Sequence, residues 1–152
     1  MELKTITEEG MRAVVSWCQN TDAAFLRQWT GKNYEYPITV EKMKTRYAGG
    51  ARMMQFELNG EIVGTIEILR ENEDTKAAYV GCFLMNPALC GKGLGTEAIQ
   101  MVKTYCKENG YQAVELSVYD YNTGALKCYQ KAGFVTYDEQ DCGDCKALYM
   151  RA

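Results

Sequence analysis

The chain has 152 residues and a formal net charge of −3, and 47% of its residues are hydrophobic. It contains no histidine, which excludes Ser-His-Asp and Cys-His catalysis and zinc sites built on imidazole. The acidic pI disfavours a nucleic-acid binder, and no apolar run reaches the roughly 18 residues of a membrane helix. We expect a single domain over residues 1–152, without a signal peptide because the N-terminus is polar.

Seven cysteines, an odd number, are more typical of reduced thiols than of a disulfide framework. They predict a cytoplasmic protein. Cys142 and Cys145 have CxxC spacing, but a redox pair usually sits at a helix N-terminus, whereas residues 141–144 have the composition of a turn. The pattern therefore favours chemically inert turn cysteines, and no further ligands stand at a spacing that would suit a metal.

In the first half of the chain the pattern predicts short helices followed by an antiparallel meander. Thr7, Asp22 or Thr21, and Thr39 are expected to cap three helices, and Asn59-Gly60 is a strong hairpin signal. The expected strands are Leu3 to Ile6, Ala51 to Leu58, Glu61 to Leu69 and Lys76 to Met85.

In the second half the pattern alternates between strand and helix. A long amphipathic helix follows a glycine-rich turn and ends at Asn109-Gly110. A strand at Tyr111 to Tyr119, a helix at Thr123 to Ala132 and a hairpin of Phe134 to Tyr137 with Lys146 to Met150 complete the chain. This order predicts an α+β fold in which the strands on either side of the long helix are parallel.

Two motifs carry chemistry. The first is the turn Cys90-Gly91-Lys92-Gly93-Leu94-Gly95-Thr96, which follows a buried strand and opens a helix. Glycines let the backbone approach a ligand closely, and the unpaired N–H groups of a helix start bind phosphate. The turn matches neither the P-loop nor the dinucleotide fingerprint. By itself, it is equally typical of a glycine-rich turn without a ligand.

The second motif is NTGALKCYQKAGF, residues 122–134. Asn122, Ala125 and Tyr129 lie at helical spacing and share one face. Together and in this order, the two motifs resemble the GNAT superfamily of acyl-CoA N-acyltransferases. The family pattern Arg/Gln-x-x-Gly-x-Gly/Ala aligns with residues 90–95, and Asn-x-x-Ala-x-x-x-Tyr-x-Lys-x-Gly-Phe aligns with residues 122–134.

The resemblance implies a fold, a cofactor and a reaction. The fold is a mixed, mostly antiparallel sheet of about six or seven strands, flanked by helices and splayed between its two central parallel strands. The reaction is direct transfer of an acetyl group from acetyl-CoA to a primary amine in a ternary complex, without a metal. The implied cofactor-binding residues are Phe83, Leu84, Met85, Gly91, Lys92, Gly93, Leu94, Gly95, Thr96, Asn122 and Tyr129.

The sequence departs from the family pattern at two positions. Cys90 stands where Arg or Gln is usual, and Lys92 is expected to supply the missing charge as a point charge. Ser117 stands where ternary-complex members often carry a glutamate base, so that base is not carried over. Tyr129 is expected to donate to the leaving thiolate. Glu67 is the predicted acceptor of the ammonium proton, with Glu35, Glu115 and Asp120 as alternatives.

The resemblance also implies that the acceptor pocket comes from the first helices and a loop with Trp29, Tyr34, Glu35 and Tyr36, which is equally typical of a small aromatic core. The expected partner is a small amine, a protein N-terminus or a lysine, with no nucleic acid or membrane, and a homodimer stays open. Two alternatives are a catalytically silent acyl-CoA sensor or interaction module, and a nucleotide-binding protein with an unusual glycine loop. The nucleotide-binding alternative gives residues 122–134 no role.

Overall fold

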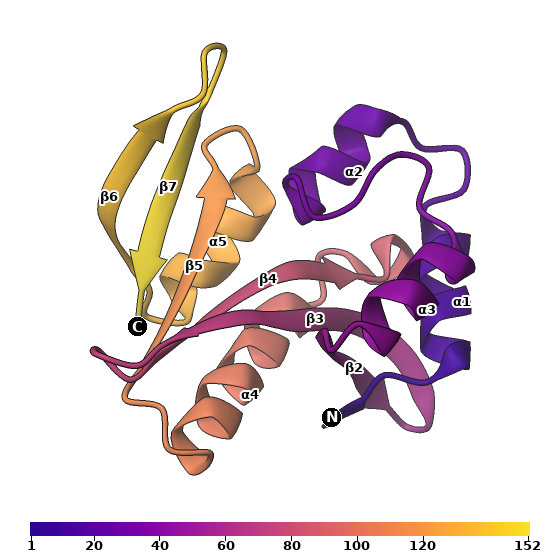
Figure 1. Ribbon diagram of the computed structural model, residues 1–152, viewed down its shortest axis with the longest axis horizontal. Coiled ribbons are helices and arrows are strands. Elements are labelled where there is room, and N and C mark those ends of the chain that lie inside the picture. Colours follow the sequence, from indigo (N-terminus) through magenta and orange to yellow (C-terminus); the bar gives the residue numbers. More distant parts are fainter. The chain divides into compact units, whose positions relative to one another are not determined.

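One seven-stranded sheet runs through the computed structural model, which describes all 152 residues (Figure 1). The strand order is β1-β2-β3-β4-β5-β7-β6. β4 and β5 are parallel, with Ala77 to Tyr79 opposite Ala113 to Glu115, while β1-β2, β2-β3, β5-β7 and β6-β7 are antiparallel. The predicted α+β class and the parallel pair are confirmed; the splay between the parallel strands stays a prediction.

The strands are β1 (Glu2–Thr5), β2 (Arg52–Leu58), β3 (Glu61–Asn72), β4 (Ala77–Met85), β5 (Ala113–Tyr119), β6 (Val135–Asp141) and β7 (Lys146–Arg151). The α-helices are α1 (Glu8–Trp17), α2 (Ala23–Thr30), α3 (Val40–Ala48), α4 (Leu94–Glu108) and α5 (Thr123–Lys131), and a short 3-10 helix, η1, spans Pro87–Leu89. None of the helices has the length and apolar character that crossing a membrane requires.

The chain divides into two compact units, Met1–Leu69 with Gly81–Gly91 and Arg70–Val80 with Lys92–Ala152. The core of the first unit is one hydrophobic cluster to which its three helices and β2 contribute. Its buried members are Ile6, Met11, Val14, Leu26, Ile38, Met43, Met53 and Leu84. In the second unit, α4 contacts α5 and β5, and β7 lies between β5 and β6.

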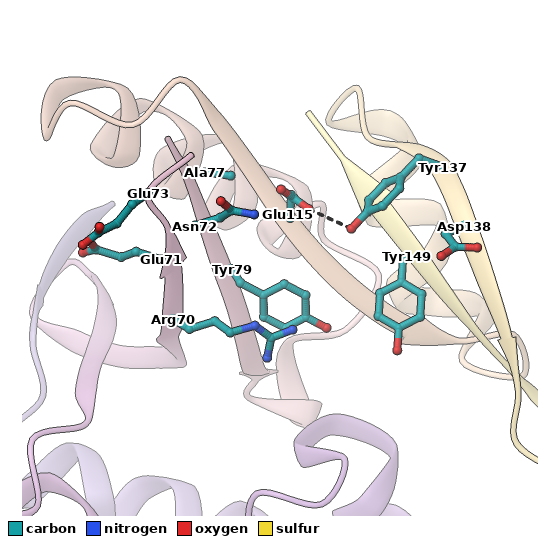
Figure 2. Close-up of a pocket in the computed structure, with 10 residues that line it drawn as sticks. All are labelled: Arg70, Glu71, Asn72, Glu73, Ala77, Tyr79, Glu115, Tyr137, Asp138 and Tyr149. Carbon is teal, nitrogen blue, oxygen red and sulfur yellow. Dashed lines mark hydrogen bonds between the residues drawn. The ribbon is translucent and has the colours of Figure 1, made fainter. Parts of the chain in front are cut away.

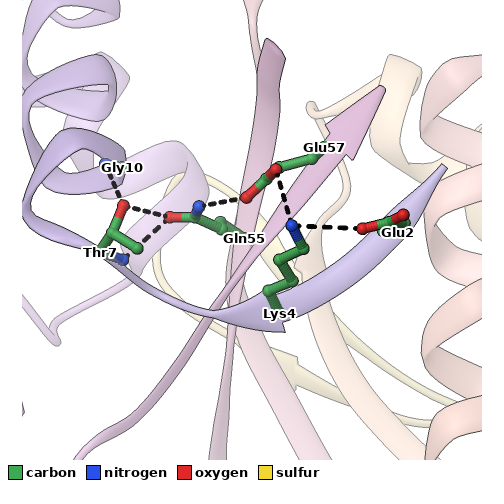
Figure 3. A network of polar contacts seen from close by, with 6 residues as sticks. All are labelled: Glu2, Lys4, Thr7, Gly10, Gln55 and Glu57. Atoms are coloured by element: carbon green, nitrogen blue, oxygen red, sulfur yellow. Dashed lines mark hydrogen bonds and ion pairs between the residues drawn. The ribbon is translucent and has the colours of Figure 1, made fainter. Parts of the chain in front are cut away.

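A buried polar side chain joins α1 to the sheet in the first unit. Gln55 is 1% exposed and accepts hydrogen bonds from the Thr7 backbone N–H at 2.9 Å and from the Thr7 hydroxyl at 3.1 Å. Its amide donates to Glu57 at 2.7 Å, and Glu57 in turn binds Lys4 at 3.1 Å (Figure 3). Because a buried amide is costly unless its hydrogen bonds are made, this network fixes where α1 begins on the sheet.

Local sequence signals predicted most of the helices and strands, and two strands are longer than predicted. The turn at Asn59-Gly60 has positive φ at both residues, 53° and 82°, as a type I′ hairpin requires. β3 continues to Asn72 and β6 to Asp141, beyond the predicted ends at Leu69 and Tyr137. All seven residues of β6 are exposed, because β6 is the last strand of the sheet, so its polar residues carry no alternating pattern.

The close approach of α1 to Gln55 requires a glycine at position 10. A Cβ on Gly10 would lie 2.1 Å from the Gln55 Oε1 and 3.0 Å from the Ile6 Cγ1. We predict that Gly10→Ala lowers the free energy of unfolding by about 1–3 kcal/mol in urea denaturation, because the buried amide must move. Gly124→Ala is the matched control, since a Cβ there meets nothing within 4 Å. A Gly10→Ala variant as stable as this control would contradict the proposed contact.

Candidate active site

The glycine-rich turn gives α4 an uncapped N-terminus. Gly91 and Gly93 have φ of +81° and +76°, a region that residues with a Cβ rarely adopt. Gly93 is the N-cap of α4, and no side chain caps that helix. The N–H groups of Leu94, Gly95 and Thr96 donate no hydrogen bond to the protein. They form an array of unpaired donors at the positive end of a helix dipole, which suits an anion.

Each of the other four α-helices has a side-chain cap. Thr7, Asp22, Thr39 and Asn122 each accept a hydrogen bond from a backbone N–H in the first turn of the helix that follows. Such a cap contributes about 1 kcal/mol, and α4 lacks one. The first turn of the longest helix is therefore less stable than a capped turn, and it stays open to a ligand.

The end of β4 follows a residue with positive φ. Four residues other than glycine have positive φ, and Cys82 is the only one of them that lies within a strand. It is buried and has a φ of 49°. This conformation costs about 1–2 kcal/mol. Phe83, Leu84 and Met85 come directly after it, and the Phe83 ring lies edge-on to Phe56 at 6.1 Å. Strain of this kind is often found beside functional backbone.

Two of the predicted residues belong to α5. Asn122 caps the helix, and its Oδ1 accepts from the Ala125 N–H at 3.4 Å. Tyr129 is 6% exposed, and its ring centroid lies 5.9 Å from that of Phe134. Burial raises the pKa of the Tyr129 phenol above its ordinary value, and Cys128 and Tyr79 add to this. Tyr129 is therefore a neutral phenol at physiological pH, able to donate a hydrogen bond but a poor source of a free proton.

Glu67 lies at the centre of a polar cluster in the first unit. Its carboxylate is 5% exposed, and it accepts from the Tyr34 hydroxyl at 2.9 Å and from the Arg46 Nε at 2.8 Å. The Arg46 guanidinium lies 4.9 Å from the centroid of the Tyr34 ring. Both carboxylate oxygens are engaged, and the cluster ties α3 and the loop after α2 to β3.

The surroundings of the Tyr34 phenol and the Cys82 thiol keep both groups protonated. Burial raises the pKa of the Tyr34 phenol, and the negative charge of Glu67 raises it further. Burial also raises the pKa of the Cys82 thiol, which is another neighbour of Glu67. The cluster therefore contains one ion pair, between Glu67 and Arg46, with a phenol and a thiol that remain protonated. Arg46 could not be singled out from the sequence, because it stands 21 positions from its partner.

The residues expected in the acceptor pocket differ in their exposure to solvent. Trp29 and Tyr34 pack against the hydrophobic core of the first unit, whereas Tyr36 is 54% exposed and Glu35 is exposed. Among the other candidate bases, Asp120 is exposed. Glu115 is buried, accepts from the Tyr137 hydroxyl at 2.7 Å and lies 3.3 Å from an Arg151 nitrogen.

A cavity of about 500 Å³ in the second unit was not predicted from the sequence (Figure 2). Arg70 lies over the ring of Tyr79 with its Cζ 3.8 Å from the centroid, and Tyr79 donates to Ser117 at 2.6 Å. Five strands contribute to the wall, so no local pattern reveals it. The lining residues are Arg70, Glu71, Asn72, Glu73, Ala77, Tyr79, Glu115, Tyr137, Asp138 and Tyr149. No group of three or more His, Cys, Asp or Glu side chains is placed to hold a metal ion.

The sequence matches the acetyltransferase (GNAT) family over residues 11–134. The chain therefore belongs to this family, as the two motifs predicted. It is 32% identical to an uncharacterized N-acetyltransferase of Methanocaldococcus jannaschii over 82 residues, which cover 51% of this chain and 36% of that protein.

Two solved structures share the fold at lower sequence identity. One is spermidine N-acetyltransferase from Vibrio cholerae in complex with CoA and spermine, with a TM-score of 0.79 and 16% identity over 99% of this chain and 94% of that one. The other is an aminoglycoside acetyltransferase in complex with coenzyme A, with a TM-score of 0.74 and 21% identity over 99% of this chain and 92% of that one.

Proposed function

We propose that residues 1–152 form one N-acetyltransferase domain that transfers an acetyl group from acetyl-CoA to a primary amine. The observation that carries this proposal is the uncapped start of α4, with Gly91 and Gly93 in left-handed conformations, in a chain of the GNAT family. The relatives named above act on amines or bind coenzyme A, according to their names, which supports an amine acceptor and a CoA donor.

The backbone supplies most of the donor site. Gly91 to Thr96 hold the diphosphate through peptide N–H groups, and Lys92 adds a positive charge where Cys90 replaces the usual Arg or Gln. The backbone of Phe83 to Met85 pairs with the pantetheine arm, as an added strand would, and a peptide N–H there polarises the thioester oxygen. Asn122 contacts the pantetheine.

The chemistry is a direct displacement. The amine nitrogen attacks the thioester carbonyl carbon, the C–S bond breaks, and an amide and a thiolate form. Tyr129, a neutral phenol, donates a hydrogen bond to the departing sulfur. Because burial raises the pKa of its hydroxyl, full proton transfer to a thiolate is more uphill than for a free tyrosine. Its contribution is therefore stabilisation of the thiolate charge.

An amine of lysine type arrives protonated, and freeing its lone pair at neutral pH costs about 4–5 kcal/mol. Glu67 is the proposed acceptor of that proton, directly or through water.

The proposed acceptor of the acetyl group is a small amine, a protein N-terminus or a lysine. The protein acts in the cytoplasm without nucleic acid or membrane as a partner. A homodimer is compatible with this scheme.

Turnover of acetyl-CoA with a panel of amines, measured as release of free thiol, tests the proposed function. We expect amine-dependent thiol release, and Tyr129→Phe is expected to lower kcat about tenfold or more with little change in the KM for acetyl-CoA. Phe retains the ring that packs against Phe134, so the fold is preserved. Binding of acetyl-CoA without turnover on any amine would indicate a silent sensor, and an unchanged kcat would remove Tyr129 from the mechanism.

The role of Glu67 as base is tested by the pH dependence of kcat. If Glu67 accepts the proton, Glu67→Gln lowers kcat and changes the shape of the pH profile of kcat, because the proton acceptor is removed. Tyr34→Phe is the matched control, because it removes one hydrogen bond to Glu67 and keeps the carboxylate. A Glu67→Gln variant with the wild-type pH profile would show that the residue serves only as the partner of Arg46.

A further inference from the structure

The turn that connects β6 and β7 (Figure 1) begins at Cys142 and ends at Cys145. The paired register of the two strands ends with Asp141 opposite Lys146. Cys142 and Cys145 come next toward the turn, and the Cys142 N–H donates a hydrogen bond of 2.9 Å to the Cys145 carbonyl. They are therefore the first and last residues of the turn, which one backbone hydrogen bond closes.

This arrangement is within the reach of a disulfide. The first and last Cα atoms of a four-residue turn lie less than about 7 Å apart, and disulfides join Cα atoms separated by roughly 4.4–6.8 Å. The connecting residue Gly143 has a φ of +98°, and its N–H donates to the Asp141 Oδ1 at 2.8 Å. The turn thus holds the two backbones in place before any bond forms.

The other five cysteines lie outside this turn. Cys82 and Cys106 are buried, while Cys142 and Cys145 are half-exposed at a surface turn. All seven carry thiols in the structure. The CxxC spacing alone predicted inert cysteines because no helix starts there. The turn brings the two cysteine backbones together without a helix, and the Cys142 thiol donates to the Gln140 carbonyl at 3.7 Å.

We propose that Cys142 and Cys145 form a reversible redox site, oxidised by a low-molecular-weight disulfide. One thiolate attacks the small disulfide, forms a mixed disulfide and releases one small thiol. The second cysteine then attacks the protein sulfur, forms the Cys142–Cys145 bond and releases the second small thiol. The small disulfide gains two electrons and two protons, and the two protein thiols lose them. This inference does not depend on the proposed acetyl transfer.

The charges around the turn select among such oxidants. Residues 138–146 include Asp138, Glu139, Asp141 and Asp144 against a single cation, Lys146. A field of this sign repels anionic partners and attracts cationic ones, and salt weakens both effects. The cationic disulfide cystamine is therefore expected to react faster than glutathione disulfide, and the difference should shrink at high ionic strength.

Oxidation of the purified chain with cystamine tests the proposal. We expect the number of titratable thiols to fall by two, and the peptide that contains residues 142–145 to lose two hydrogens in mass without an adduct. Amide hydrogen exchange in β6 and β7 should slow after oxidation, because the bond cross-links the two strands at the turn and limits its local opening.

Single substitutions provide the controls. Cys142→Ser and Cys145→Ser should each retain a cysteamine adduct on the remaining cysteine, since the resolving thiol is absent. Cys90→Ser, which changes an exposed cysteine elsewhere, should leave the formation of the internal bond unchanged. Stable adducts on both cysteines of the wild type, a bond between two chains, or no reaction at the turn would overturn the proposal.

Discussion

The proposed activity depends on peptide N–H groups that the protein leaves without partners at the start of α4. Four helices close their first turns with a side-chain oxygen, and α4 begins instead at Gly93, in a left-handed conformation that no side chain caps. The cost is about 1 kcal/mol of missing capping energy. In return, an anion meets several aligned donors and the positive end of a long helix dipole. A diphosphate with two negative charges suits both, and membership of the GNAT family makes a coenzyme A thioester the proposed donor.

The first unit adds a second constraint, the ion pair between Glu67 and Arg46. Breaking a buried pair by removing one partner usually costs several kcal/mol, although the partial exposure of Arg46 lowers that figure here. The pair fixes α3 and, through Tyr34, the loop after α2 against β3. The same carboxylate lies next to Cys82, the residue of β4 with positive φ. One acidic residue thus links the loop that follows α2 to the strand whose end is proposed to hold the thioester.

Local signals predicted the elements that depend on local physics. The caps at Thr7 and Thr39 and the type I′ turn at Asn59-Gly60 need only neighbouring residues, and the structure confirms them. Features formed by residues that are far apart in the sequence could not be predicted from local patterns. The partner of Glu67 is such a case, and so is the cavity beside Tyr79, which residues of five strands line.

The candidate site was predicted from the sequence only through its motifs. Gly91 to Thr96 and residues 122–134 identify the family, but the missing cap of α4 becomes visible only in the structure. β6 was underestimated because an exposed edge strand needs no apolar alternation. The contact between Cys142 and Cys145 could not be predicted either, because the spacing of two cysteines does not show that their backbones are hydrogen-bonded across a turn.

Isothermal titration of the chain with coenzyme A, compared with pantetheine, tests the central claim most directly. Pantetheine has the thiol arm and lacks the diphosphate. The account predicts heat of association at one site for coenzyme A, none for pantetheine, and loss of the signal in Gly93→Val, since a β-branched residue disfavours the left-handed conformation that starts α4. Absence of measurable binding by coenzyme A, or equal binding by pantetheine, would contradict it.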